Sequence, residues 1–281
     1  MLEFPALPND LPWTQPAYLL LDGVRLAPLI EHLRGFNASA YCLYLNTRWH
    51  ELADISPQLV PLTNANDPLL AHFVEHAAQE WGYLLFSDAK AQTVCEHWRS
   101  LLTVEHPSGV EVMPRIADPA VMHPLFALAE LASSARWFGP FTHLCLPDGV
   151  ENRWHRHTRP GALTAPPLPY RITDQELAAL EEVEFRRFIS GLHEHLQTYF
   201  ADFMATFAPA ERRPYAQKIA DAALQRGFTC EQEITLFANV FGYLAGEPIN
   251  DHPQIVQLLS ASTAEAPLLR LQRAATLAEN R

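Results

Sequence analysis

The sequence predicts an α/β N-terminal domain, with a mixed sheet and flanking helices, followed by an all-α C-terminal helical bundle. From Ala17 to Pro147, short apolar runs alternate with stretches whose apolar residues recur at every third or fourth position. A proline-rich segment then interrupts this pattern, and only the helical spacing recurs beyond it. The 281 residues, 48% of them hydrophobic and 19% charged, suffice for one large domain or two modest ones.

Six short runs in the first half are rich in Leu, Val, Tyr and Phe and are bounded by Asp, Gly, Asn or Pro, which is typical of strands. These strands are predicted over Tyr18–Leu21, Ala40–Leu45, Leu59–Leu62, Gly82–Phe86, Val110–Pro114 and His143–Leu146. Amphipathic helices are predicted between them, over Leu26–Phe36, Pro68–Glu80, Ala89–Val104 and Pro119–Leu131. The alternation predicts a central sheet covered by helices.

Residues 148–171 contain five prolines or glycines from Pro160 to Pro169 and little periodicity, so they are predicted to be a linker between domains 1–147 and 172–281. Beyond them, Thr173 and Glu176 form a capping box at the start of a helix. If unbroken to Ala205, this helix would be about 48 Å long at ~1.5 Å per residue.

Four further helices are predicted in the second half. The first runs over Ala210–Arg226 and stops at Gly227, and the next opens with a capping box from Thr229 to Gln232 and ends before Gly246. Shorter helices are predicted over Pro253–Ser260 and Leu268–Glu279. No repeat or low-complexity segment is evident.

The charge balance disfavours two classes of partner. The chain has 20 Lys and Arg against 32 Asp and Glu, a formal net charge of -12, which disfavours nonspecific binding to nucleic acid or to an anionic membrane. The N-terminus lacks the basic and apolar regions of a signal peptide, and no apolar run approaches ~20 residues. Four widely spaced cysteines without a CxxC pair indicate reduced thiols. We therefore expect a cytoplasmic protein that does not insert into membranes.

No catalytic motif is recognisable, since GxSxG, the P-loop and GxGxxG are all missing from the sequence. The segment His72-Phe-Val-Glu-His76 has the HxxEH order of one metalloprotease family. A metal site also needs a third ligand and a cleft, so we interpret this segment as an amphipathic helix. The sequence thus predicts no enzyme, no cofactor and no metal site.

Arg115 and Asp118 lie where a predicted strand gives way to a helix that begins at Pro119. Asp118 has the position of a helix N-cap, with proline at the first helical position. Arg115 is predicted to form an ion pair with Asp118, Asp22 or Glu96. An architectural role is the preferred interpretation of both residues, and partner binding is the alternative.

Two further groups are candidates for partner contacts. His97 and Arg99 flank the apolar face of a predicted helix on which Trp98 lies. Trp137 and Phe138 precede a Gly-Pro turn, which fits a packed corner, whereas an exposed aromatic pair would mark a binding hot spot.

Trp154 and Arg156 belong to a local basic and aromatic cluster in an otherwise acidic chain. We interpret this cluster as a loop that docks an acidic segment of a partner, and a solvated linker is the equally simple alternative. The net charge argues against nucleic acid as the ligand.

Four signatures follow one another between residues 17 and 140: Tyr18-Leu-Leu-Leu-Asp-Gly23, His97-Trp-Arg-Ser-Leu-Leu102, Pro114-Arg-Ile-Ala-Asp-Pro119 and Trp137-Phe-Gly-Pro140. In this order they resemble the effector chaperone (adaptor) family of the bacterial type VI secretion system. In that family the second and third signatures look like His-Leu-Arg and Arg-Phe-Tyr-Asp-Pro, so Trp98 and the Ile116-Ala117 pair are departures.

The resemblance implies an adaptor that binds a cognate toxic effector protein and loads it onto the VgrG spike protein. It implies two partner surfaces, one expected near Arg115 and Trp137 on the α/β domain and the other on the helical tail. Two alternatives remain: a hydrolase whose titrating groups converge in an unrecognised cleft, and a structural component of the secretion apparatus that assembles symmetrically.

Overall fold

The computed structural model describes residues 4–131, 135–161, 169–260 and 265–281. The chain divides into two compact units, Met1–Glu181 and Glu182–Arg281. The division falls inside helix α6 (Asp174–Tyr199), so the first unit includes the first turns of that helix. Among the described helices, none has the length and apolar character that crossing a membrane requires.

The first unit is built on a six-stranded sheet with the order β2-β3-β1-β4-β7-β8. All described pairings between its strands are antiparallel, where the sequence predicted a mixed sheet. The α/β class with flanking helices is confirmed. The strands are β1 (Ala17–Leu21), β2 (Tyr41–Cys42), β3 (Gln58–Leu62), β4 (Gly82–Ser87), β7 (Phe141–Asp148) and β8 (Arg153–Thr158).

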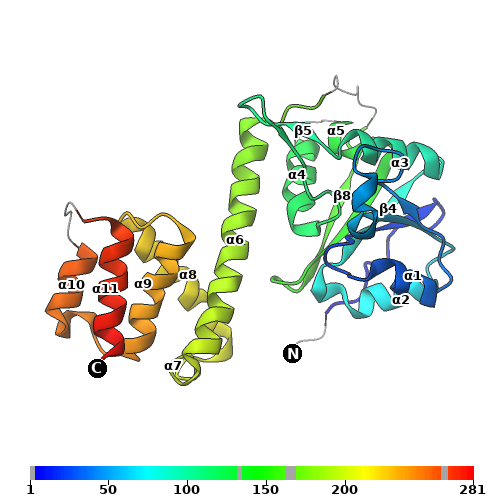
Figure 1. The fold of residues 1–281 in the computed structure, drawn as a ribbon. Coiled ribbons are helices and arrows are strands. Elements are labelled where there is room, and N and C mark those ends of the chain that lie inside the picture. The colour runs from blue at the N-terminus through cyan, green and yellow to red at the C-terminus, as the bar shows by residue number, and fades with distance from the viewer. Residues whose placement is uncertain (1–3, 132–134, 162–168, 261–264) are drawn as a thin grey trace. The chain divides into compact units, whose positions relative to one another are not determined.

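Helices cover both faces of this sheet because successive side chains of a strand point to opposite faces (Figure 1). On one face, Leu84 and Phe86 of β4 join the core formed with α1 (Leu29–Gly35) and α2 (Pro68–Glu75). On the other face, the ring of Tyr83 contacts Trp98 of α3 (Ala91–Ser100) and Phe126 of α4 (Pro119–Leu131). The central strands are buried on both faces as a result.

Strand β8 corrects part of the predicted linker, because residues 153–158 pair with β7 as an edge strand of the sheet. Successive side chains of β8 point to opposite faces of the sheet, so Trp154 contacts Phe73 on one face and His157 contacts Phe126 on the other. The sequence did not reveal this strand because polar residues occupy positions where apolar ones are expected. Residues 162–168 of the predicted linker lie outside the described residues.

Two other predicted strands are shorter than expected, since β2 has two residues and β6 is confined to Glu111–Val112. Strand β6 pairs with β5 (Val104–Glu105) in a separate hairpin. A short 3-10 helix, η1 (His50–Ile55), and the four-residue helix α5 (Ala135–Phe138) were not predicted.

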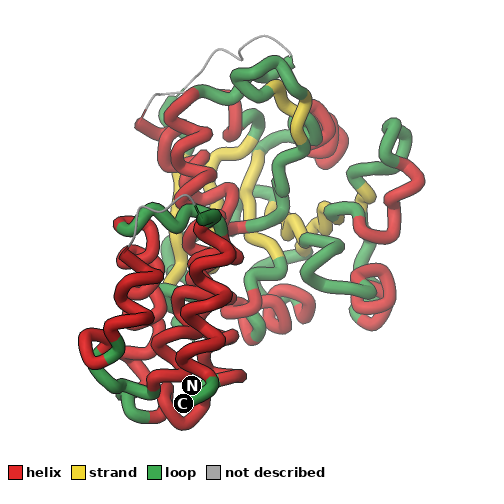
Figure 2. The backbone as a smooth tube through the Cα atoms, turned by 60° about the vertical axis from the view of Figure 1, so that its left-hand side comes forward, coloured by secondary structure: helices red, strands yellow, loops and turns green. Residues whose placement is uncertain are grey.

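The second unit is all-helical among its described residues, as predicted, and Figure 2 shows it as helices joined by loops. Its helices after α6 are α7 (Ala201–Ala205), α8 (Pro209–Gln225), α9 (Glu231–Leu244), η3 (Ile249–Asp251), α10 (Pro253–Ser260) and α11 (Pro267–Glu279). The predicted unbroken helix to Ala205 is interrupted at Phe200, whose φ of -131° and ψ of 46° are not helical.

Capping boxes were predicted at the starts of two helices, α6 and α9. At the start of α6, the Glu176 carboxylate accepts the Thr173 N–H at 2.9 Å, and the Thr173 hydroxyl accepts the Glu176 N–H at 3.2 Å, so this capping box is confirmed. At the start of α9, the acceptor for the Thr229 N–H is Glu233 and not Gln232. A carboxylate is the stronger acceptor beside the positive end of a helix.

Candidate functional site

Arg115 forms an ion-pair network at the end of β1. Its guanidinium donates to Asp22 Oδ2 at 2.6 Å and lies 3.4 Å from Asp118 Oδ2. Both carboxylates are buried, whereas the Arg115 side chain is 40% exposed. Asp118 also accepts the Ala120 N–H at 3.0 Å, as expected of a residue that caps α4. The network therefore ties the end of β1 to the segment that leads into α4, and two of the three predicted partners of Arg115 are confirmed.

Trp137 and Phe138 are completely buried, so they form a packed corner and not an exposed aromatic pair. The Trp137 indole donates to Glu176 Oε1 at 2.6 Å, and the Tyr170 hydroxyl donates to the same carboxylate at 2.7 Å. Burial, and then the hydrogen bond to Glu176, raise the pKa of the Tyr170 hydroxyl well above its ordinary value. The beginning of α6 is anchored to the sheet unit by this buried carboxylate.

His97 and Arg99 are also held inside the fold. His97 Nε2 lies 3.3 Å from the Trp137 carbonyl oxygen, and burial lowers the pKa of His97 from 6.5 to about 4. Arg99 donates to the backbone carbonyls of Leu43 at 3.1 Å and Cys42 at 3.0 Å. Both side chains stabilise the path of the chain around α3.

Trp154 and Arg156 contact the N-terminal segment of the chain. The Trp154 indole donates to the Pro5 carbonyl at 2.8 Å, and its ring meets Phe4 edge-on. Arg156 forms an ion pair with Asp10, which with the accompanying hydrogen bond lowers the pKa of that carboxyl. The basic cluster thus already binds an acidic residue of its own chain.

A group of histidines lies between β8 and α4. His123 Nδ1 is 2.9 Å from His157 Nε2, and His157 Nδ1 is 2.9 Å from Glu130 Oε2. The ring of His155 stacks on His123 with centroids 3.5 Å apart, and its Nε2 is 3.0 Å from Asp148 Oδ2. Burial, followed by the neighbouring histidines, lowers the pKa of His123 to about 3, so this ring is neutral at physiological pH.

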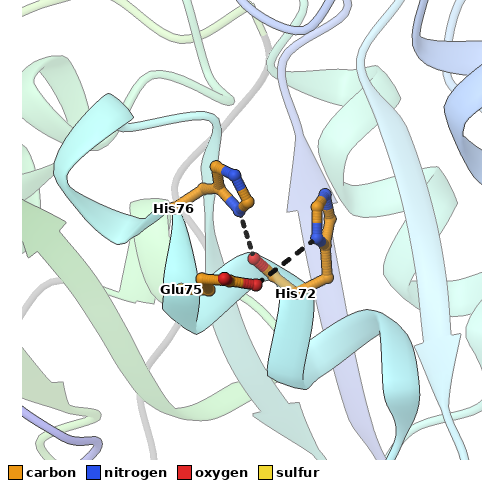
Figure 3. A group of neighbouring side chains, drawn as sticks. All are labelled: His72, Glu75 and His76. Atoms are coloured by element: carbon orange, nitrogen blue, oxygen red, sulfur yellow. Dashed lines mark hydrogen bonds and ion pairs between the residues drawn. The ribbon is translucent and has the colours of Figure 1, made fainter.

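Two clusters among the described residues have the composition of a metal site. One consists of Asp148, Glu151 and His155, and the other of His72, Glu75 and His76; in each, the possible ligand atoms lie within 4.8 Å of one another. Figure 3 shows the second cluster, in which His72 and Glu75 lie in the last turn of α2 and His76 is the residue that follows the helix. This is the HxxEH segment that the sequence analysis interpreted as an amphipathic helix.

The second unit has an apolar pocket of about 360 Å³ between α7, α8, α9 and η3. Phe203, Phe207 and Tyr215 contact one another along one wall, and Lys218 and Glu247 are the charged residues of its lining. Burial raises the pKa of the Tyr215 hydroxyl to about 12. An apolar side chain of a partner fits such a pocket, and sequence reasoning did not find it.

The first unit exposes large apolar side chains along one segment, residues 41–55, which includes the edge strand β2 and η1. Tyr41, Leu52 and Ile55 are each 43% exposed and Leu45 is 52% exposed. In the same segment the Arg48 guanidinium lies 4.7 Å from the centroid of the Trp49 ring. Tyr, Trp and Arg are the residues most enriched at binding hot spots. Sequence reasoning placed a strand here and missed this exposed face.

Comparison with known proteins identifies a domain in the first unit. Residues 17–135, which include β1 to β4 and helices α1 to α4, match the family model described as "Domain of unknown function (DUF4123)". DUF4123 is a domain of type VI secretion effector chaperones and adaptors, so the resemblance inferred from the four signatures is confirmed.

One relative extends the likeness beyond this domain. "Accessory protein VasW" of Vibrio cholerae serotype O1 is 26% identical over 268 residues, which are 93% of this chain and 87% of that protein. No solved structure matches the chain. Together the domain and the relative support an adaptor-type role associated with type VI secretion.

Proposed function

We propose that this protein is an adaptor that binds a cognate type VI effector and loads it onto the VgrG spike protein. The observation that carries this proposal is the DUF4123 match over residues 17–135. The accessory relative, aligned over 93% of the chain, supports the same role for both units.

An adaptor of this kind needs two partner surfaces. Trp137 and Phe138 cannot line the first of them because they are buried. We assign it instead to the exposed apolar segment of residues 41–55, since large apolar side chains, Arg48 and Trp49 gather there. The second surface is the aromatic pocket of the helical unit.

The test is purification of the tagged full-length protein from cells of its own species that express the secretion system, followed by mass spectrometry of the bound proteins. Recovery of VgrG together with one toxin-like protein would support the proposal. A protein that elutes without either partner, at moderate salt and from cells that contain both, would refute it.

Two variants then separate the surfaces. Leu45→Asp with Leu52→Asp places charges in the exposed apolar segment, and Ile249→Asp places one at the rim of the aromatic pocket. Each should lose one of the two partners and keep the other. The matched control is Leu131→Asp in α4, at a leucine that is 86% exposed, which should keep both. If neither variant lost a partner, the assignment of surfaces would be wrong.

The hydrolase alternative finds little support. The aromatic pocket of the helical unit, the pocket between Phe4 and Glu75 and the pocket at Thr103 to Glu111 have no histidine, cysteine or serine in their lining. Cys145 is buried, and burial raises the pKa of its thiol to about 12. The thiol therefore stays protonated, and the nucleophilic thiolate is suppressed. The accessory relative also points away from catalysis.

A further inference from the structure

The fold brings a third histidine to the HxxEH segment. His32 of α1 lies 40 residues before His72 in the chain, yet the Nε2 atoms of these two rings are 2.7 Å apart. The ring centroids of His32 and His72 are 4.8 Å apart, and those of His72 and His76 are 4.3 Å apart. The third ligand that the sequence did not supply is therefore provided by a neighbouring helix.

A hydrogen bond to the backbone fixes the tautomer of His76 in the form that can bind a metal. His76 Nδ1 is 2.9 Å from the His72 carbonyl oxygen, as the dashed line in Figure 3 marks. A carbonyl has no proton to give, so Nδ1 carries the proton and donates it, which leaves a free lone pair on Nε2. A backbone carbonyl that fixes the tautomer in this way is the usual outer partner of a metal-bound histidine.

His72 and His32 present their Nε2 atoms to each other. Two lone pairs cannot face each other at 2.7 Å, so one Nε2 carries a hydrogen and donates it to the other, and a bound cation would replace that hydrogen. The opposite nitrogen of His72, Nδ1, lies 4.0 Å from Glu75 Oε2. A carboxylate beside the second ring nitrogen raises the basicity of the first, which strengthens it as a ligand.

Trp81 forms an apolar support for the three rings. It stacks on His76 with centroids 4.6 Å apart and an angle of 14°, and its centroid lies 5.6 Å from that of His72 and 5.7 Å from that of His32. Trp81 itself is almost fully buried. Rings held by packing lose little conformational entropy when an ion binds.

We propose that His32, His72 and His76 bind a divalent transition-metal ion of the zinc type through their Nε2 atoms, with water as the fourth ligand and Glu75 as the outer carboxylate on the Nδ1 side of His72. Imidazole nitrogens favour zinc, copper and nickel over magnesium and calcium. Tetrahedral ligands at ~2.0–2.1 Å from zinc lie about 3.4 Å apart. The Nε2 atoms of His32 and His72 are 2.7 Å apart, so these two rings must move apart by about 0.7 Å at their Nε2 atoms to share one ion.

The site is accessible to solvent. Glu75 is 75% exposed and also lines a surface pocket next to the N-terminal segment, and the His72 side chain is 24% exposed. The bound ion would join α1 to α2, so its expected role is to stabilise the first unit. This proposal does not depend on the adaptor function.

The test uses the untagged full-length protein, stripped of metal with a chelator and then titrated with Zn²⁺ in a calorimeter. We expect one equivalent to bind and the Tm to rise. His72→Gln should weaken binding by at least about 100-fold, more than the roughly 10–100-fold that loss of an outer partner costs. His32→Gln, on the other helix, should also weaken it.

His155→Gln is the matched control, because His155 belongs to the other described cluster that could hold a metal. It should leave the zinc affinity unchanged. Circular dichroism of each metal-free variant checks the fold, and the spectrum of bound Co²⁺ reports tetrahedral nitrogen ligands without reference to stability. No zinc binding by the wild type, or binding lost with His155→Gln but kept with His72→Gln, would overturn the proposal.

Discussion

A comparison of substitutions at Trp137 and at Trp98 measures what the hydrogen bond to the buried Glu176 carboxylate contributes to the free energy of unfolding. Both indoles are completely buried. The Trp137 N–H donates to Glu176 at 2.6 Å, whereas the Trp98 N–H has no hydrogen-bond partner among the described residues. Replacing each by Phe removes the same volume from the same unit, so the difference between the two variants reports the hydrogen bond.

The expected difference follows from three contributions to the free energy of unfolding. The cavity left by each change is similar and cancels to first order. A hydrogen bond to a charged acceptor contributes about 1.5–3 kcal/mol, which only Trp137→Phe loses. A buried N–H without a partner costs ~1–3 kcal/mol, which Trp98→Phe removes. We therefore expect Trp137→Phe to be less stable than Trp98→Phe by about 2.5–6 kcal/mol, the sum of these two contributions.

The assay is urea unfolding of the full-length chain, followed by tryptophan fluorescence. All six tryptophans lie between residues 13 and 154, so the signal reports the first unit alone. Glu176→Gln, alone and combined with Trp137→Phe, completes a double-mutant cycle that isolates the coupling between the two side chains. Equal stability of the two Phe variants, with no coupling in the cycle, would refute the reasoning.

Three further predictions use the same unfolding assay. Gly139→Ala should cost at least about 3 kcal/mol, since Gly139 has a φ of +46° and a methyl group there would lie 2.2 Å from the His97 ring. The pKa of His97 is lowered from 6.5 to about 4, so between these pH values His97 binds a proton in the unfolded chain but not in the folded chain. Stability should fall as pH drops from about 6.5 towards 4, by about 2 kcal/mol at about pH 5, and His97→Gln should lose that part of the pH dependence. Asp22→Asn keeps the oxygen that accepts the Val24 N–H but removes the ion pair with Arg115, so a loss of about 1–2 kcal/mol is expected, with no loss if the pair contributes nothing.

Local patterns predicted most of the helices and the central strands. Helix α4 spans the predicted residues 119–131, and α10 spans the predicted residues 253–260. Strand β4 was predicted within one residue of its observed end because Tyr83 to Phe86 form an apolar run bounded by Gly82. These signals succeed because they depend on neighbouring residues only.

The candidate site was harder to predict. Arg115 pairs with Asp22 and Asp118 as expected, but Trp137 and Phe138 are interior side chains and Arg156 binds Asp10 of its own chain. Burial cannot be inferred from the residue type alone, because a large aromatic side chain serves equally well in a core and at an interface.

The sequence by itself determined the α/β unit, the helical unit after it and the capping box at Thr173, because apolar periodicity and capping follow from local backbone geometry. The tertiary structure alone decided that β8 joins the sheet, that Glu176 meets Trp137, and that His32 meets His72. Trp137 and Glu176 are 39 positions apart and His32 and His72 are 40 apart, and no local pattern encodes contacts at such separations or the strand order β2-β3-β1-β4-β7-β8.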